Sequence, residues 1–165
     1  MPDQRPFLTH PEDFSDVSRG KPIPHTLKGA ALVSARLTPG TWRLEIEALE
    51  GAKIDKPRCL ADKTALDLPA LLALGEKHGV KFLKAMQCNN IALPLGQGLW
   101  EGVPLRVLLG ATGKMSNVRR VYYWGFHNND PAQMFRSSLA INQVLDTPPG
   151  ELPPFVAYRL NGQPI

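Results

Sequence analysis

The chain has 165 residues, 43% of them hydrophobic and 21% charged, which suits one soluble domain with a single core. Its 16 prolines and 14 glycines favour short strands, turns and long ordered loops over a pure helix bundle. The net charge of +4 comes from scattered basic residues, with Arg119 and Arg120 as one adjacent pair, so the pattern does not indicate a nucleic-acid-binding surface.

Other classes are excluded by the same kind of evidence. No apolar run is long enough to cross a bilayer, and the polar start of the chain, MPDQRPFLTH, has no signal-peptide hydrophobic stretch. A fold stapled by disulfides usually has more cysteines than Cys59 and Cys88. A structural zinc site is not supported, because there is no Cys-x-x-Cys and the four histidines stand far apart.

The first half of the chain divides into an arm and the start of a domain. Residues 1–40 are rich in Pro, Gly and Ser and predict an extended arm laid over a single domain of residues 41–165. Apolar and polar residues alternate over Trp42–Ala48, which predicts a strand with one buried face. Asp67 is a suitable cap for a short helix within Ala65–Leu74.

The following elements are predicted in the same way. Val80–Met86 indicates a strand that delivers Cys88 to its end, and Pro104 can start a helix that Gly110 stops. Further strands are expected at Val118–Trp124, Phe135–Leu139 and Phe155–Leu160, with an exposed loop at Gly125–Pro131 and a turn at Asn161 and Gly162. Without regular strand-helix alternation, the fold class is α+β: a mixed sheet with short helices and long loops.

Cys88 raises the main chemical question. It stands in the stretch Lys84–Asn90 (KAMQCNN), among polar amides just after a predicted strand. The residues alone leave four interpretations: a metal ligand, a nucleophile, half of a disulfide, or a small buried side chain. Reactive groups often sit at such strand ends.

The order of motifs from Trp42 to Ile165 resembles the first part of the molybdopterin-binding domain of the sulfite oxidase family. Four features carry the resemblance, and the N-terminal arm adds Arg5-Pro-Phe-Leu-Thr and the pair Pro22-x-Pro24. The four are Trp42-Arg-Leu-Glu-Ile, Cys88-Asn89, Trp100-x-Gly-Val-Pro-Leu-Arg-x-Leu-Leu109 and Ala157-Tyr-x-Leu-Asn-Gly-Gln-Pro-Ile165.

The resemblance implies an oxidoreductase that carries the molybdenum cofactor. In that family the cysteine thiolate binds molybdenum, which makes Cys88 the metal ligand, and a soft thiolate suits a metal held mostly by sulfur. The other cofactor-binding candidates are Arg19, Asn89, Asn90 and His127. Three residues are candidates for a catalytic role: His127, Phe135 and Arg136.

The chain also departs from the family pattern. Sulfite-oxidising members follow the cysteine with a glycine, then asparagine and arginines, whereas Asn89-Asn90-Ile91 follows here and removes positive charge that would hold an oxyanion. Phe135 takes the place of a tyrosine near the metal, and His127 that of an acidic residue. In the arm, Ser18 and Gly20 replace an arginine and a histidine, with Arg19 or His25 as a substitute.

Arg136 and the loop have simpler interpretations too. Arg136 either replaces the lost anion-binding charge or is a solvated strand residue, and His127 with Asn128 either approaches the metal or forms a plain turn. Trp100 is expected to be a packing anchor between helix and sheet.

Two functions therefore stay open at this stage. The first is oxygen-atom or two-electron transfer on a small substrate, with electrons passing to a separate carrier because no haem or Rossmann motif is present. The second is a cofactor-free binding or assembly domain on the same scaffold.

Relatives of this kind are often periplasmic. The family domain continues beyond the last turn, so we expect a fragment, a cleavage product or a reduced homologue, with a terminal strand edge open to self-association or a second chain.

Overall fold

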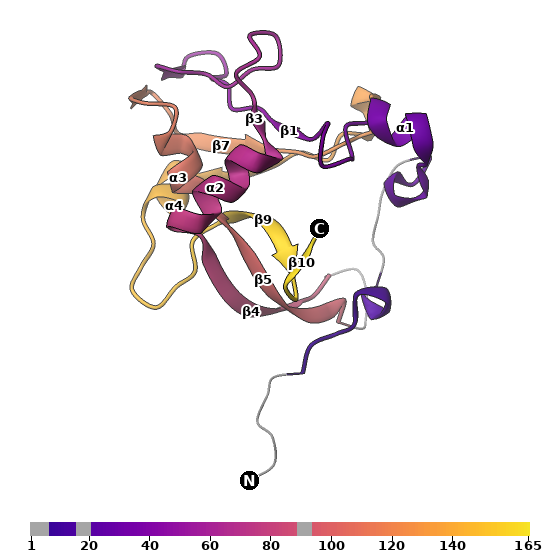
Figure 1. The fold of residues 1–165 in the computed structure, drawn as a ribbon. Helices are drawn as coiled ribbons and strands as arrows, with labels where there is room; N and C mark the ends of the chain where they lie inside the picture. Colours follow the sequence, from indigo (N-terminus) through magenta and orange to yellow (C-terminus); the bar gives the residue numbers. More distant parts are fainter. Residues whose placement is uncertain (1–6, 16–20, 89–93) are drawn as a thin grey trace.

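An antiparallel sheet of four strands forms the centre of the molecule. The computed structural model describes residues 7–15, 21–88 and 94–165. Within them the sheet has the strand order β10-β9-β5-β4 (Figure 1). The longest ladder joins β4 to β5 and runs from Val80 opposite Gly102 to Met86 opposite Gly96. The strands are β4 (Val80–Met86), β5 (Gly96–Pro104), β9 (Phe155–Leu160) and β10 (Gln163–Pro164).

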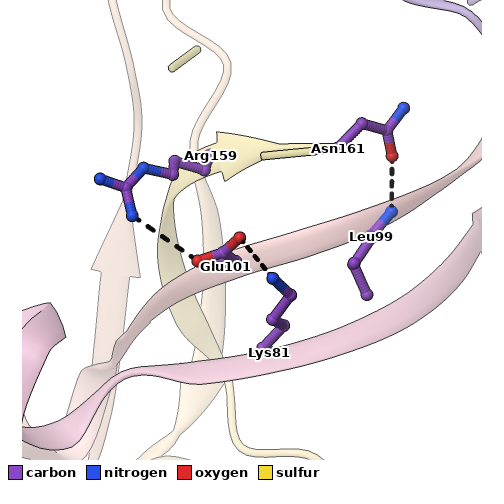
Figure 2. Close-up of polar contacts among 5 residues, drawn as sticks. All are labelled: Lys81, Leu99, Glu101, Arg159 and Asn161. Carbon is purple, nitrogen blue, oxygen red and sulfur yellow. Dashed lines mark hydrogen bonds and ion pairs between the residues drawn. The ribbon is translucent and has the colours of Figure 1, made fainter. Parts of the chain in front are cut away.

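Glu101 links the three longest strands of this sheet. Lys81 on β4 and Arg159 on β9 both lie opposite it in the ladder, so the three side chains meet. The Nζ atom of Lys81 is 2.9 Å from Oε1 of Glu101, and Nη1 of Arg159 is 3.7 Å from Oε2 (Figure 2). The Glu101 side chain is only 15% exposed, which limits screening by solvent. The ion pairs therefore hold β4, β5 and β9 in register.

Three helices gather beside the sheet at the end where β5 passes into a helix (Figure 1). Asp67 caps the first of them, because its Oδ1 accepts a hydrogen bond of 2.9 Å from the Ala70 amide. Gly75 on this helix allows the Tyr158 ring to approach closely: a Cβ atom there would lie 2.6 Å from the tyrosine oxygen. The helices are α2 (Leu68–His78), α3 (Leu105–Gly110) and α4 (Ile141–Leu145), and the buried core cluster is Leu71, Val103, Leu108 and Tyr158.

Shorter elements surround this core. Three two-stranded ribbons are formed by β1 with β3, β2 with β6, and β7 with β8. Their bounds are Arg43–Leu44, Leu66–Asp67, Lys53–Ile54, Met115–Ser116, Arg120–Tyr123 and Ser137–Ala140, in the order named. The remaining helices are α1 (Gly29–Ser34) and the 3-10 turns η1 (Pro11–Asp13), η2 (Pro24–Thr26) and η3 (Pro131–Gln133).

Residues 9–15 lie against the end of the β4–β5 hairpin where the connecting segment joins its strands. Thr9 is buried and pairs with Gln97: its N–H donates to the Gln97 carbonyl and its Oγ1 accepts from the Gln97 amide, both at 2.8 Å. The side chain of Asn161 links the arm to β5. Its Oδ1 accepts a hydrogen bond from the Leu99 amide (Figure 2), and its Nδ2 donates one to the Thr9 carbonyl. Phe14 packs against Gly96, where a Cβ atom would lie 2.5 Å from the ring.

The expected α+β class is confirmed, with differences in detail. The helix after Asp67 and the strands Val80–Met86 and Phe155–Leu160 form as predicted. The strand predicted for Trp42–Ala48 forms only in part. Two of its residues pair with β3 as β1, and Ile46 then forms an isolated bridge to Arg58, because the chain turns away from β3 after two ladder positions. The prediction that Phe155–Leu160 is the terminal strand is wrong. The turn at Asn161 and Gly162, both with positive φ, brings β10 back along the edge of this strand.

Candidate functional site

Cys88 lies two residues beyond the end of β4. The hairpin holds this position, since β4 pairs with β5 over its full length and the Leu95 amide donates to the Met86 carbonyl just before it. The cysteine is half-buried and forms no disulfide. The residue as a whole is therefore partly exposed, and its sulfur is not part of a disulfide. Asn89 and Asn90, the predicted neighbours, lie outside the described residues.

Cys59 has a different environment, although it is also half-buried and free of a disulfide. A hydrogen bond to the Glu47 carboxylate raises the pKa of the Cys59 thiol from 9.0 to about 11, with further contributions from burial and from the charges of Glu47, Asp62 and Glu45. A thiol with this pKa is protonated at neutral pH. Because metals bind the thiolate, Cys59 is a poor ligand.

The loop of residues 125–136 contains a hydrogen-bonded turn around Asp130. Its Oδ1 accepts from the Ala132 amide at 2.9 Å and its Oδ2 accepts from Nε2 of Gln133 at 3.0 Å. The bond from Gln133, then that from Ala132 and the nearby charge of His127, lower the pKa of the Asp130 carboxyl. The aspartate is ionised at neutral pH and fixes the loop.

The predicted site residue His127 and its neighbour Asn128 have buried atoms without partners. Nδ1 of His127 and Oδ1 of Asn128 have no hydrogen-bond partner among the described residues. Leaving such an atom unsatisfied costs about 1–3 kcal/mol, so water or a bound polar group normally satisfies it. These two atoms are therefore candidates for contacts to a ligand.

Phe135 and Arg136 are placed at the surface just before β8. Phe135 is 62% exposed, and the Arg136 guanidinium lies 4.7 Å from the centre of the Trp124 ring, which is also exposed. The position of Arg136 thus favours the solvated interpretation over that of a charge inside a pocket. Trp100 is half-buried on β5, and its indole Nε1 also has no partner among the described residues.

The N-terminal arm connects the two candidate regions. Ser15 donates to the Leu95 carbonyl beside the Cys88 end of the hairpin, and Lys21 donates to the Gln133 side chain in the loop of His127. Six residues of chain span at most about 22 Å, so these two attachment points lie within that distance. Arg19 is outside the described residues, and His25 is exposed on η2.

Sequence reasoning missed the residues that fasten these segments. Asp130 followed by Pro131 is a recognisable helix-start signal and could have been identified. The contacts of Gln133, Thr9 and Asn161 to distant parts of the chain carry no local signal, although Asn161 was predicted as a turn residue. A groove of about 380 Å³ lies elsewhere, beside α4, with lining residues that include Asn142, Asp146, Glu151 and Leu152.

The comparison with protein families matches this chain over residues 31–165 to the oxidoreductase molybdopterin-binding domain. The chain belongs to this family. The predicted resemblance to this molybdopterin-binding domain is thereby confirmed. No curated protein matches the chain. Within the described ranges, no helix has the length and apolar character needed to span a bilayer, and no cluster of three or more His, Cys, Asp or Glu side chains is arranged to hold a metal ion.

The described residues of this molybdopterin-binding domain fit its cofactor in two respects. Cys88 is a partly exposed cysteine without a disulfide, and thiolate sulfur is the donor that suits a sulfur-bound second-row metal. The unpartnered atoms of His127 and Asn128 suit the polar groups of a bound pterin or substrate.

Proposed function

We propose that the chain is a molybdenum oxidoreductase domain in which Cys88 is the protein's ligand to the metal. Membership in the molybdopterin-binding family supports the cofactor, and the contrast between the two cysteines carries the assignment of the ligand. Cys88 is half-buried just beyond a strand end, whereas the Glu47 carboxylate raises the pKa of the Cys59 thiol to about 11 and so disfavours its thiolate. The cofactor-free binding or assembly domain is the weaker alternative, because the family is defined by cofactor binding.

The residues of the chain have distinct roles in this proposal. The bound cofactor supplies the exchange of an oxygen atom or two electrons with a small substrate. Cys88 holds the metal through its thiolate, and the hairpin fixed by Glu101 keeps that sulfur in place. His127 offers a buried ring nitrogen, Nδ1, that has no hydrogen-bond partner among the described residues and can contact a bound group. Phe135 has no polar side-chain atom, so it cannot donate a hydrogen bond to substrate oxygen.

Other parts of the proposal rest on the sequence alone. Arg136 stays an anion-binding candidate only through its position in the sequence, because its exposed place over Trp124 favours the solvated interpretation. Electrons pass to a separate carrier protein, and the substrate is small. Arg19, Asn89 and Asn90 are proposed to contact the cofactor, on the basis of their positions in the sequence.

Molybdenum content tests this function directly. Wild-type protein and two variants, Cys88→Ser and Cys59→Ser, are purified from a molybdenum-replete host, and the metal is measured per folded chain. We expect the wild type and Cys59→Ser to hold molybdenum near stoichiometry and Cys88→Ser to lose most of it. Full retention in Cys88→Ser would refute the ligand assignment, and a folded wild-type protein without molybdenum would favour the cofactor-free alternative.

A further inference from the structure

Gln133 forms hydrogen bonds to Asn128 and Asp130 in its own loop and to Lys21 in the N-terminal arm. Its Oε1 accepts from the Lys21 amide at 2.9 Å and from Nδ2 of Asn128 at 2.8 Å. Its Nε2 donates to Oδ2 of Asp130 at 3.0 Å. Lys21 is 112 residues away in the sequence, so this one half-buried amide joins the N-terminal arm to the loop of His127 and Asn128.

The chemistry of these partners fixes which way each amide points. The Lys21 backbone N–H is only a donor and the Asp130 carboxylate is only an acceptor, so the oxygen of Gln133 faces Lys21 and its nitrogen faces Asp130. Asn128 then has to present its nitrogen to the same oxygen. The orientation of Asn128 is thus set by the hydrogen-bond network, independently of how its amide atoms are assigned.

The consequence is a buried acceptor without a partner. Since Nδ2 of Asn128 is used by Gln133, its Oδ1 is the atom left over, and it is buried next in sequence to the similarly unpartnered Nδ1 of His127. An acceptor that is held in place and unsatisfied is suited to receive a hydrogen bond from an N–H or O–H group of a ligand.

We propose that Gln133 is a positioning residue that orients Asn128 and ties the loop of His127 and Asn128 to the arm at Lys21. In this orientation Asn128 Oδ1 and His127 Nδ1 together bind a ligand group with an N–H or O–H donor. The proposal rests on the proposed function for the identity of the ligand, which is then the pterin or the substrate of the molybdenum centre. The orientation of Asn128 does not depend on that function.

The first test uses the full chain without cofactor. In Gln133→Ala we expect hydrogen exchange of the Lys21 amide to accelerate about fivefold and the Asn128 side-chain amide resonances to shift. Gln143→Ala is the matched control, because Gln143 also accepts a backbone hydrogen bond, from Ala140, but on α4. It should leave Lys21 and Asn128 unchanged. Unchanged exchange and resonances in Gln133→Ala would overturn the positioning role.

A rescue variant separates positioning from general stabilisation. Gln133→Glu alone sets two carboxylates against each other, and we expect it to release Lys21 as Gln133→Ala does. Adding Asp130→Asn exchanges the amide and the carboxylate and can re-form the bonds to the Lys21 amide, Asn128 and residue 130, losing only the long 3.5 Å contact to the Lys21 carbonyl, so the double variant should restore slow exchange and the wild-type Asn128 resonances. A double variant that resembles Gln133→Ala would refute the proposed network.

The ligand is tested with molybdenum-loaded protein. We expect molybdenum to be lost on dialysis about fivefold faster from Gln133→Ala than from the wild type or Gln143→Ala, and the double variant to regain retention. Equal loss rates in all four proteins would overturn the ligand contact. If the wild type holds no molybdenum, the proposed function and the ligand contact fail together, while the exchange measurements still decide whether Gln133 orients Asn128.

Discussion

The two cysteines show how the surroundings of a side chain, rather than its burial, decide what it can do. Both are half-buried and both are free thiols. Cys59 lies among carboxylates and donates a hydrogen bond to Glu47, which holds it in the neutral form. Cys88 lies in the segment that connects the two strands of a hairpin, and the N-terminal arm packs against this end. The first arrangement disfavours the thiolate, which is why Cys88 rather than Cys59 is the cysteine that we propose as the ligand.

The largest effect should come from disturbing the hairpin that carries Cys88. In Gly96→Ala, the added methyl group would lie 2.5 Å from the Phe14 ring at a position with φ of +150°, so the arm has to move. We expect a loss of about 2 kcal/mol in the free energy of unfolding, measured by urea denaturation. The control is Gly110→Ala, since a Cβ atom there meets nothing within 4 Å. A variant at position 96 as stable as this control would mean that the arm does not pack as described.

A smaller loss is expected from removing Asn161. Its side chain joins the Leu99 amide on β5 to the Thr9 carbonyl in the arm. Asn161→Ala should lower the free energy of unfolding by roughly 1–2 kcal/mol and speed hydrogen exchange at Leu99. Thiol labelling of Cys88 should rise while that of Cys59 stays the same. Equal changes at both cysteines would show that the two regions are not separate.

The environment of Cys59 can be tested through Glu47. Glu47→Gln removes the carboxylate that raises the pKa of Cys59 most, so its rate of alkylation at pH 8 should increase by about tenfold. Labelling of Cys88 serves as the internal reference and should not change. No increase at Cys59 would show that Glu47 does not control the thiol.

The same contact makes stability depend on pH. The pKa of Cys59 in the folded chain is about 11, above its ordinary value of 9.0, so the neutral thiol stabilises the fold. This contribution is fully present below about pH 9 and is lost as the pH rises toward 11. In Glu47→Gln, the loss of stability over this alkaline range should be smaller than in the wild type.

Local patterns predicted the elements that depend on neighbours in the chain. α2 was found because Asp67 and Pro69 are start signals, and β4 because an apolar run ends before polar amides. The family resemblance was recognised from four motifs and their order along the chain, and one of these motifs contains Cys88. The ladder positions of Trp42–Ala48 could not be foreseen, because the length of a strand depends on its distant partner.

The candidate site was less predictable, for the same physical reason. The network of Gln133 joins residues 112 positions apart, and no local pattern encodes such a contact. Arg136 was predicted as a possible pocket charge, but it stacks on Trp124, a contact between strand ends that the sequence does not reveal. The difference between the cysteines was hidden as well, since Glu47 approaches Cys59 through folding rather than adjacency.

The central claim is that the sulfur of residue 88 binds molybdenum, and X-ray absorption at the molybdenum edge tests it most directly. The account predicts that the spectrum of the wild type contains a protein sulfur ligand in addition to those of the cofactor, and that this contribution is missing from any metal left in Cys88→Ser but unchanged in Cys59→Ser. The same sulfur coordination in Cys88→Ser as in the wild type would contradict it.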